Sequence, residues 1–432
     1  GLVHSNKLFN PKNGTIGNFH KLNNTVKNNS GSNENNYENG IAIKTIFKKI
    51  KSTYFWSNKA IHGNRNDSII YSLKTDGLYR TYSEIEKRNT NRYNLYGTQQ
   101  TYDYKKLTLH HNSILYTSKL IYKPDLKYYN TYYNYRNLWN NSLAYKYSGR
   151  NFLFRGEIAA DKEGDFAFTN FLVFNLDESS FLINGRYFSH KYNSFRSTTI
   201  SESSQVQNEK GVLFAIEGIE NAISYYLSAD FFSFTSPKYL IHLPSFGKEY
   251  LGMLSISINS SSNIKLFGKK EVKMKDNNSN QIDAITQYNN SRFYIHYKTF
   301  LTNSIQFETR TDLTFQTSSN QTAKGRSSYL NLSRKTEKTL IAARVTYFNT
   351  DNWDTRIYLY EHDVLYHFSI PAFYDTGFRY FVNYTIKIGN LTHLWLKYGK
   401  TQYFNKMSIG NGNDKIQGNV KSEIRVQLRV RF

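Results

Sequence analysis

The chain has 432 residues, no cysteine and a formal net charge of +23. The absence of cysteine excludes disulfide frameworks, cysteine-ligated zinc, iron–sulfur clusters and thiol nucleophiles. Aromatic residues make up 16% of the chain, although the mean hydropathy is only −0.63. Rings in this number bury too much surface to stay solvated, which disfavours a disordered chain.

The excess of 56 basic over 33 acidic residues has several interpretations. It fits a nucleic-acid surface, a contact with anionic lipid phosphates, a lumen selective for anions, or a sequence enriched in Lys, Asn and Tyr by its coding composition. The basic residues are spread along the chain rather than clustered, which disfavours nucleic acid as a partner. We therefore expect membrane lipid as the contacting surface.

The hydrophobic pattern indicates a membrane protein built from strands. No run of about 18 apolar residues is present, so a transmembrane helix is not expected. Polar and apolar residues instead alternate with a period of two. In a barrel only every second residue faces lipid, and aromatic rings band both interfaces, which explains the low hydropathy. We expect an all-β fold: one large antiparallel transmembrane β-barrel over residues 1–432, in a bacterial outer membrane.

In chain order, residues 22–40 are rich in Asn, Ser and Gly and predict a mobile surface loop, and the first strand is expected near Ile41. Barrels alternate short periplasmic turns with longer surface loops. Short links are predicted at His62–Arg65, Tyr104-Lys105, Gly149-Arg150, Glu178-Ser179, Glu220-Asn221, Asn259–Ser262, Thr302-Asn303, Thr336–Lys338 and Gly389-Asn390. Longer polar stretches lie between them at 74–92, 118–137, 190–209, 235–248, 274–290, 316–326 and 404–421, with a shorter one at 161–165.

The stretch 349–378 is long for a single connection. We interpret Arg356–Glu361 and Val364–Ile370 as two further strands joined by a tight turn at His362-Asp363. The visible chain then carries about 21 strands by its period-two segments. Single-chain bacterial barrels have even strand numbers, so we expect at least one strand before Gly1 and 22 or more in the full barrel.

Charged residues lie on one face of several predicted strands. Along 304–315, 341–347 and 379–388, apolar residues alternate with polar residues. A polar face suits a water-filled lumen, since the other face meets lipid. The residues predicted to face the lumen are Arg310, Arg344, Arg379 and Lys387.

The terminal segment 422–432 carries the clearest strand signal. A C-terminal aromatic residue that closes an alternating strand is the type of signal read by the outer-membrane assembly machinery, so we expect that machinery as a partner during biogenesis. The strand should end at the periplasmic rim and pair with the first strand of the barrel. Its apolar positions are Ile424, Val426, Leu428, Val430 and Phe432, and its polar positions are Glu423, Arg425, Gln427, Arg429 and Arg431.

Motifs for catalysis, metals or cofactors are weak. The segment Tyr360–Asp363 with His367 would suit a metal or proton site, but its spacing fits no HExxH motif and we interpret it as a polar turn. No phosphate-loop spacing of glycines and no G-x-S-x-G motif occurs. The sequence therefore assigns no catalytic, metal or cofactor-binding residue, and we expect a protein that is not an enzyme.

Several ordered motifs resemble an outer-membrane barrel family of Bacteroidota whose members usually carry helix-hairpin-helix repeats before the barrel. The motifs are Thr75–Thr81 with Ser83–Ile85, Ser204–Gly211, Asp354–Gly377, Ile409–Gly412 with Ile416–Asn419, and the terminal strand. The resemblance implies a location and a fold. Residues 1–40 have no helical period, so the repeats are not visible here and DNA binding is not carried over. The family supplies no catalytic residues.

The expected function is that of a channel, a transporter or a structural component of the envelope, with a protein partner as one option. The alternative is an accessory subunit of a secretion, assembly or DNA-uptake machine. A barrel enzyme would require a His or Ser close to a carboxylate at the rim, and a soluble β-protein would require an apolar inside and a polar outside. A wide barrel needs a plug, a partner or folded-in loops, for which 190–209 and 404–421 are candidates.

Overall fold

The computed structural model describes all residues except 1–34, 36, 124–134, 195–196, 277–284, 319–320, 390, 411, 413–414 and 432. Within the described residues, one sheet holds 21 strands and two further sheets hold two strands each. The predicted all-β, antiparallel fold class is therefore confirmed. The helices described are α1 (Tyr82–Glu86) and the 3-10 turn η2 (Trp353–Thr355), and no described helix is long and apolar enough to cross a membrane.

The long strands have 10 to 16 residues, which is enough to cross a bilayer at a tilt. The first strands are β1 (Gly40–Phe47), β2 (Ile50–Ile61), β3 (Gly63–Asn66), β4 (Ile69–Leu73), β5 (Asn91–Tyr104), β6 (Leu107–Tyr122), β7 (Tyr135–Ser148), β8 (Phe152–Asp161), β9 (Phe166–Asn175), β10 (Ser179–Phe188), β11 (Glu209–Glu220) and β12 (Ile223–Phe234). The later strands are β13 (Ser245–Ser257), β14 (Ser262–Asp276), β15 (Ile285–Phe300), β16 (Ile305–Ser318), β17 (Gln321–Lys335), β18 (Thr339–Thr350), β19 (Ile357–Tyr358), β20 (Ala372–Phe373), β21 (Thr376–Ile388), β22 (Thr392–Tyr403), β23 (Ser408–Ile409), β24 (Ile416–Gln417) and β25 (Val420–Val430).

The chain divides into two compact units. The first comprises Gly1–Glu217, Ser228–Lys248 and Met274–Ile285, and the second comprises Gly218–Leu227, Glu249–Lys273 and Thr286–Phe432. In the first unit, β1 pairs with β2, β2 with β5, and each strand from β5 to β9 with the next, all antiparallel. β3 and β4 form a hairpin that joins β6 through a short parallel pairing.

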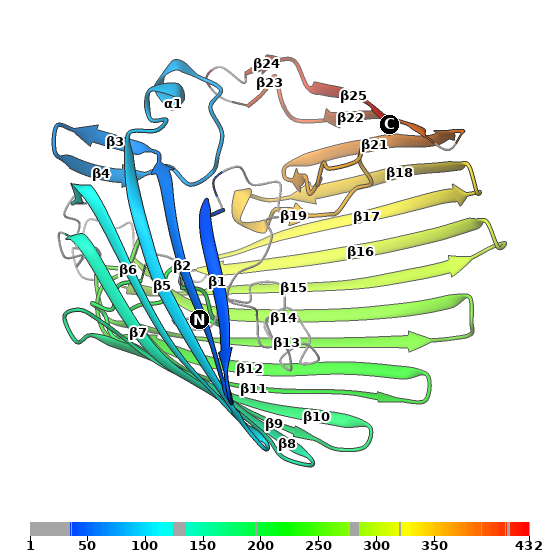
Figure 1. Cartoon of the computed structure of the whole chain (residues 1–432). Helices are drawn as coiled ribbons and strands as arrows, with labels where there is room; N and C mark the ends of the chain where they lie inside the picture. The colour runs from blue at the N-terminus through cyan, green and yellow to red at the C-terminus, as the bar shows by residue number, and fades with distance from the viewer. Residues whose placement is uncertain are drawn as a thin grey trace. The chain divides into compact units, whose positions relative to one another are not determined.

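In the second unit, β15, β16, β17, β18, β21, β22 and β25 pair antiparallel in that order. Figure 1 shows β15 to β18 side by side in yellow and green, with short connections at one end. We call this the turn end; it holds the connections 301–304, 336–338 and 389–391. The opposite end holds the longer connections 351–375 and 404–419.

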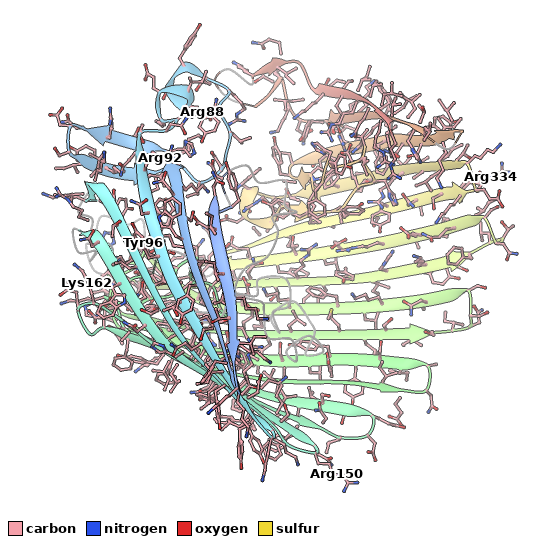
Figure 2. All side chains as sticks on the ribbon, in the orientation of Figure 1. Arg88, Arg92, Tyr96, Arg150, Lys162 and Arg334 are labelled. Carbon is pink, nitrogen blue, oxygen red and sulfur yellow. The ribbon has the colours of Figure 1, made fainter. Side chains whose placement is uncertain are left out.

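Polarity across the strands is the reverse of that in a soluble β-protein. In the second unit, the register partners Leu330 and Val345 are 59% and 53% exposed, whereas the partners Asn331 and Arg344 are 0% and 5% exposed. Side chains project from both faces of these strands (Figure 2). In the first unit the exposed residues include Leu143 and Ile158, and the buried ones include Ser142 and Glu157. The prediction of lipid-facing strands is confirmed, and the soluble alternative is not.

Most predicted connections are confirmed. The first strand begins at Gly40, next to the expected Ile41, and every predicted short link except His62–Arg65 joins two consecutive strands. The loops 74–90, 189–208 and 235–244 lie where longer stretches were predicted. The predicted loop 22–40 falls largely outside the described residues, as does Phe432. The predicted loops 118–137 and 274–290 were too long: residues 124–134 and 277–284 lie outside the described residues, and the flanking residues 118–122, 135–137, 274–276 and 285–290 belong to strands.

Two predicted connections are wrong. Residues 62–65 do not form a turn: β3 begins at Gly63, and His62 Nδ1 accepts a hydrogen bond from the Asn89 N–H at 2.9 Å. Residues 316–326 are not a loop, because β16 runs to Ser318 and β17 starts at Gln321. Hydroxyl groups of Thr317 and Thr322 pair across these strands at 3.0 Å. Threonine is polar but favours strands, so a polar strand end was mistaken for a loop.

The predicted strand at Val364–Ile370 is also wrong. The structure shows no strand there; it has the two-residue strands β19 and β20 on either side, with a single bridge between Glu361 and Ser369. Tyr366 adopts a left-handed φ of 68°, which breaks an extended conformation. The strand number still agrees with the prediction, because the stretch 40–73 forms four strands, β1 to β4, where the predicted link at His62–Arg65 implied two.

Candidate functional site

The connection between β18 and β21 folds back onto the polar face of the second unit. It begins with η2, whose N-terminus is capped by the Asn352 side chain; this oxygen accepts hydrogen bonds from the Asp354 and Thr355 N–H groups at 3.0 and 3.1 Å. The chain then enters β19, which pairs with β20. We call residues 356–373 the inner hairpin. The cap satisfies backbone donors that water would otherwise have to reach.

Alternation within the inner hairpin directs every second side chain toward the sheet. Ile357 and Leu359 are 0% and 2% exposed, and Tyr358 and Tyr360 are 42% and 51% exposed. Burial of one such aliphatic side chain contributes about 1.5–3 kcal/mol. The apolar cluster that holds the hairpin also contains Tyr329, Phe348, Phe373, Tyr403 and Ile409. The predicted constriction segment 404–421 thus contributes Ile409 to this cluster.

Glu361 is the charged anchor of the inner hairpin. Its carboxylate is fully buried and accepts two hydrogen bonds from the Arg379 guanidinium, from Nε at 2.6 Å and from Nη2 at 2.8 Å. Lys397 Nζ lies 3.3 Å from the same carboxylate. A bidentate arginine–carboxylate pair fixes both distance and orientation, so the hairpin is locked in register with β21 and β22.

Asp363 provides a second anchor at the tip of the hairpin. It accepts hydrogen bonds from Lys397 Nζ at 2.9 Å and from Arg425, and His367 Nδ1 lies 3.1 Å away. Burial opposes the ionisation of Asp363, but the hydrogen bonds from Lys397 and from the Val364 N–H and the positive charges of Lys397 and Arg425 together outweigh it and keep the pKa of this carboxyl below its usual value. The neighbouring His362 has a lowered pKa, first because of burial and second because of the positive charge of Arg344.

Two further arginines hold backbone carbonyl groups of the hairpin. Arg344 Nη1 donates to the Tyr360 carbonyl oxygen at 2.6 Å, and its guanidinium lies 4.0 Å from the centre of the Tyr329 ring. Arg292 Nη2 donates to the Tyr358 carbonyl oxygen at 3.1 Å. These bonds replace the backbone partners that a two-residue strand cannot supply.

The four predicted lumen-facing residues are therefore not equivalent. Arg379 and Arg344 contact the inner hairpin directly. Arg310 borders it, because it forms a bidentate pair at 2.7 and 2.6 Å with Asp312, which also bonds Arg292. Lys387 lies on the same face but at the turn end, away from this group.

Sequence reasoning missed Glu361, Lys397 and Arg425 as parts of one network. It treated the acidic residues as a polar turn, because a connection long enough to fold back gives no periodic signal of its partner. A signal that could have revealed the network is the set of arginines on one face of the strands, with few acidic residues in register to pair with them. Among the described residues, no group of three or more histidine, aspartate or glutamate side chains is arranged to hold a metal ion.

The first unit has its own folded-in connection, residues 189–208 between β10 and β11, as predicted for 190–209. Tyr192 and Val206 are buried in a cluster with Phe188. The Asn193 N–H donates to Asp161 at 3.1 Å, and the Glu202 N–H donates to Glu209 at 2.8 Å. This loop therefore offers apolar side chains and neutral donors to its own sheet.

Comparison with known proteins finds no matching family model and no matching curated protein. Solved structures do match. OmpT expressed in the outer membrane of Vibrio cholerae matches with a TM-score of 0.34 and 7% identity over 78% of this chain and 98% of that chain. OccAB3 of Acinetobacter baumannii gives 0.31 and 8% over 71% and 94%, and the siderophore receptor PiuA of the same organism gives 0.33 and 11% over 88% and 64%.

One expectation requires correction. The sequence predicted a protein that is not an enzyme, and the three matches to forms of OmpT overturn that prediction. The structure also contains the close histidine–carboxylate contact that the enzyme interpretation demanded, between His367 and Asp363 at 3.1 Å. The exclusion of enzymatic activity is withdrawn. The outer-membrane location agrees with the exposed apolar and buried polar faces of the strands.

Proposed function

We propose that this chain forms an outer-membrane β-barrel that acts as a channel or transporter, with the inner hairpin as a removable obstruction of a polar lumen. The observation that carries the proposal is the pairing of Glu361 and Asp363 with cations of the sheet. These carboxylates neutralise Arg379 and Lys397, which are buried on the polar face. A hairpin held only by apolar contacts would need no such charges.

The balance of energies supports a reversible contact. Buried ion pairs lose most of their Coulomb gain to desolvation, so they are weak sources of stability compared with apolar packing. If the hairpin moves, the cations become available to an anionic solute or to water. The proposed cycle therefore exchanges the hairpin carboxylates for another partner at the same guanidinium and ammonium groups.

Single-channel conductance in a planar bilayer tests this proposal. We expect the purified chain to show low, intermittent conductance, and Glu361→Gln to raise the open fraction at least severalfold. Asp354→Asn is the matched control, because Asp354 lies in the same connection but is half exposed and weakly paired at 4.0 Å. Equal conductance of the wild type and of a correctly folded Glu361→Gln variant would contradict the proposal.

A second candidate is an accessory subunit of an envelope machine that docks a protein partner. The observation that favours it is a group of exposed aromatic side chains on the far side of the inner hairpin. Tyr360 packs against Phe368 with ring centres 5.7 Å apart, and Phe368 is 74% exposed. Stable co-purification with a partner, lost on Phe368→Ser, would favour this function. The resemblance to a Bacteroidota family and the contact with the assembly machinery stay predictions.

A further inference from the structure

A second group of basic side chains lies at the turn end of the second unit. Lys387 in β21 is the register partner of His393 in β22, and His393 is the register partner of Arg429 in β25. Register partners in antiparallel strands share a face, with Cβ atoms about 5 Å apart. We call Lys387, His393, Arg429 and Arg431 the rim cation cluster; Arg431 continues β25 on the same face, and its N–H donates to the Leu391 carbonyl at 3.0 Å.

Two side chains of this cluster, those of Arg429 and His393, contact each other. Arg429 Nη2 lies 3.4 Å from His393 Nδ1. The His393 ring stacks on Trp395 with centres 5.6 Å apart and an interplanar angle of 20°, and the Arg429 guanidinium lies 5.4 Å from the same indole. Trp395 is buried. The indole therefore packs against both the imidazole and the guanidinium.

Charge neutralisation separates this cluster from the site under the inner hairpin. Arg379, Lys397 and Arg425 are on the same three strands, and each pairs with a carboxylate of the inner hairpin. Across the described part of the chain, no ion pair links a member of the rim cation cluster to Asp or Glu. Lys387 and Arg429 lie on either side of His393, two strand spacings or about 10 Å apart, so an anion beside His393 would be attracted by both.

Hydrogen bonding shows the same deficit. The Nε–H of Arg429 and the Oε1 of Gln427, two residues earlier on the same face, are buried without a protein partner. An unsatisfied buried donor costs about 1–3 kcal/mol. An acceptor with several negatively charged oxygens would satisfy the guanidinium of Arg429 and also be attracted by the ammonium of Lys387. Arginine and lysine together are the usual partners of such groups.

We propose that the rim cation cluster binds the phosphate group of a soluble anion. The residues fix the source of the ligand. Arg429 and Arg431 share the polar face with Arg425 and Gln427, whereas Leu428 and Val430 between them form the exposed apolar face. A lipid phosphate would approach from the apolar side, so a solute on the polar side is the better match. This site does not depend on movement of the inner hairpin.

Isothermal titration of the full chain in uncharged detergent with inorganic pyrophosphate tests the site. We expect one saturable site per chain. Lys387→Gln and Arg429→Gln should each weaken it at least tenfold. Arg334→Gln is the matched control: Arg334 also lies at the turn end (Figure 2), but on the apolar face with Leu330 and Leu332. Its affinity should stay within twofold of the wild type.

Three results would overturn the proposal: no saturable binding, binding that all three variants retain equally, or binding abolished by vesicles that contain phosphatidylglycerol but not by phosphatidylcholine vesicles. The last result would identify a lipid headgroup as the ligand. Heat-modifiable gel mobility reports whether each variant has folded. Because Lys387 is exposed near the end of its strand, Lys387→Gln keeps the test valid if Arg429→Gln fails to fold.

Discussion

The two folded-in connections hold to their own sheets by different means. The loop 189–208 of the first unit contributes Tyr192, Val206 and backbone N–H groups, while the charges beneath it are balanced within the strands. There Arg186 pairs with Glu209 at 2.6 Å and with Asp230 at 2.7 Å. The inner hairpin of the second unit instead supplies two carboxylates, Glu361 and Asp363, to the cations of its sheet.

This difference decides what each unit would lose if its connection moved away. The first unit would expose apolar surface but keep its Arg186 charge balanced. The second unit would expose apolar surface and also separate Lys397 from both of its carboxylates, while Arg379 would lose Glu361 and keep Glu423 of β25. The second connection is therefore coupled to ions, protons and anionic solutes.

Removal of the buried carboxylate should produce the largest effect. Glu361→Gln weakens two charge-assisted hydrogen bonds from Arg379, each worth about 1.5–3 kcal/mol, although Arg379 keeps Glu423 and Lys397 keeps Asp363 as charged partners. Hydrogen exchange should show lost protection of the Glu361 N–H, which donates to the Ser369 carbonyl at 3.0 Å. The loop 189–208 should be unaffected. Unchanged protection of the hairpin would show that its apolar cluster alone holds it.

Truncation of Tyr192 tests whether apolar packing holds the loop 189–208 to the first unit. Tyr192 is 1% exposed, and removing a buried aromatic side chain costs about 3 kcal/mol. Tyr192→Ala should increase proteolytic cleavage within 189–208 to the same extent at low and high salt. Tyr82→Ala, at a side chain that is 89% exposed, serves as the control. A strong salt dependence would contradict the inference that this loop is held by apolar packing rather than by ion pairs.

Acid should loosen the inner hairpin in two steps. His362 has a folded-state pKa below its usual 6.5, so the hairpin loses stability as the pH falls below about 6.5 and the opened state takes up the proton. The pKa of Asp363 is also lowered from 3.8, so its contribution is present above about pH 4 and is lost as the pH falls through the folded value. Hydrogen exchange at pH 7 and pH 5 isolates the first step, which His362→Gln should abolish.

Salt should have the smallest effect. Between 0.1 and 1 M the Debye length falls from about 10 to 3 Å, but the pairs of Glu361 are buried and poorly screened. Arg425, whose side chain is 27% exposed, is the pair member that salt can reach. We expect a change in hairpin protection of less than about 1 kcal/mol, which Arg425→Gln should remove. A larger effect would mean that the network is more hydrated than its burial indicates.

The sequence predicted the strands well because their signal is local. Alternation along β16, β18, β21 and β25 identified the polar and apolar faces residue by residue, and the short turns followed from the same pattern. Polar strand ends, such as the one at Thr317, were predicted as loops because their composition is typical of loops. The sequence pattern fails to predict the end of a strand where polar residues extend that strand beyond the membrane.

The site was only partly predictable. Arg344 and Arg379 were identified by their face, but their partners are 16 and 18 residues away on a connection without regular structure. The segment 356–361 does alternate, which suggested a strand; the structure uses that alternation to place Ile357, Leu359 and Glu361 against the sheet. The local pattern therefore identified which side chains share a face of the sheet. Their contacts with other segments depend on long-range packing, which the local pattern does not contain.

The alternation of Asn331 and Arg344 with Leu330 and Val345 also constrains how the chain inserts into a membrane. A slip of one residue in strand pairing would turn an entire face over and carry Arg344 into hydrocarbon. An arginine on the lipid face near the midplane costs about 2–4 kcal/mol. Where several neighbouring strands carry such residues, the costs of their slipped pairings add up. The buried charged residues of the strands therefore disfavour a slipped register during insertion, before any solute or hairpin contacts them.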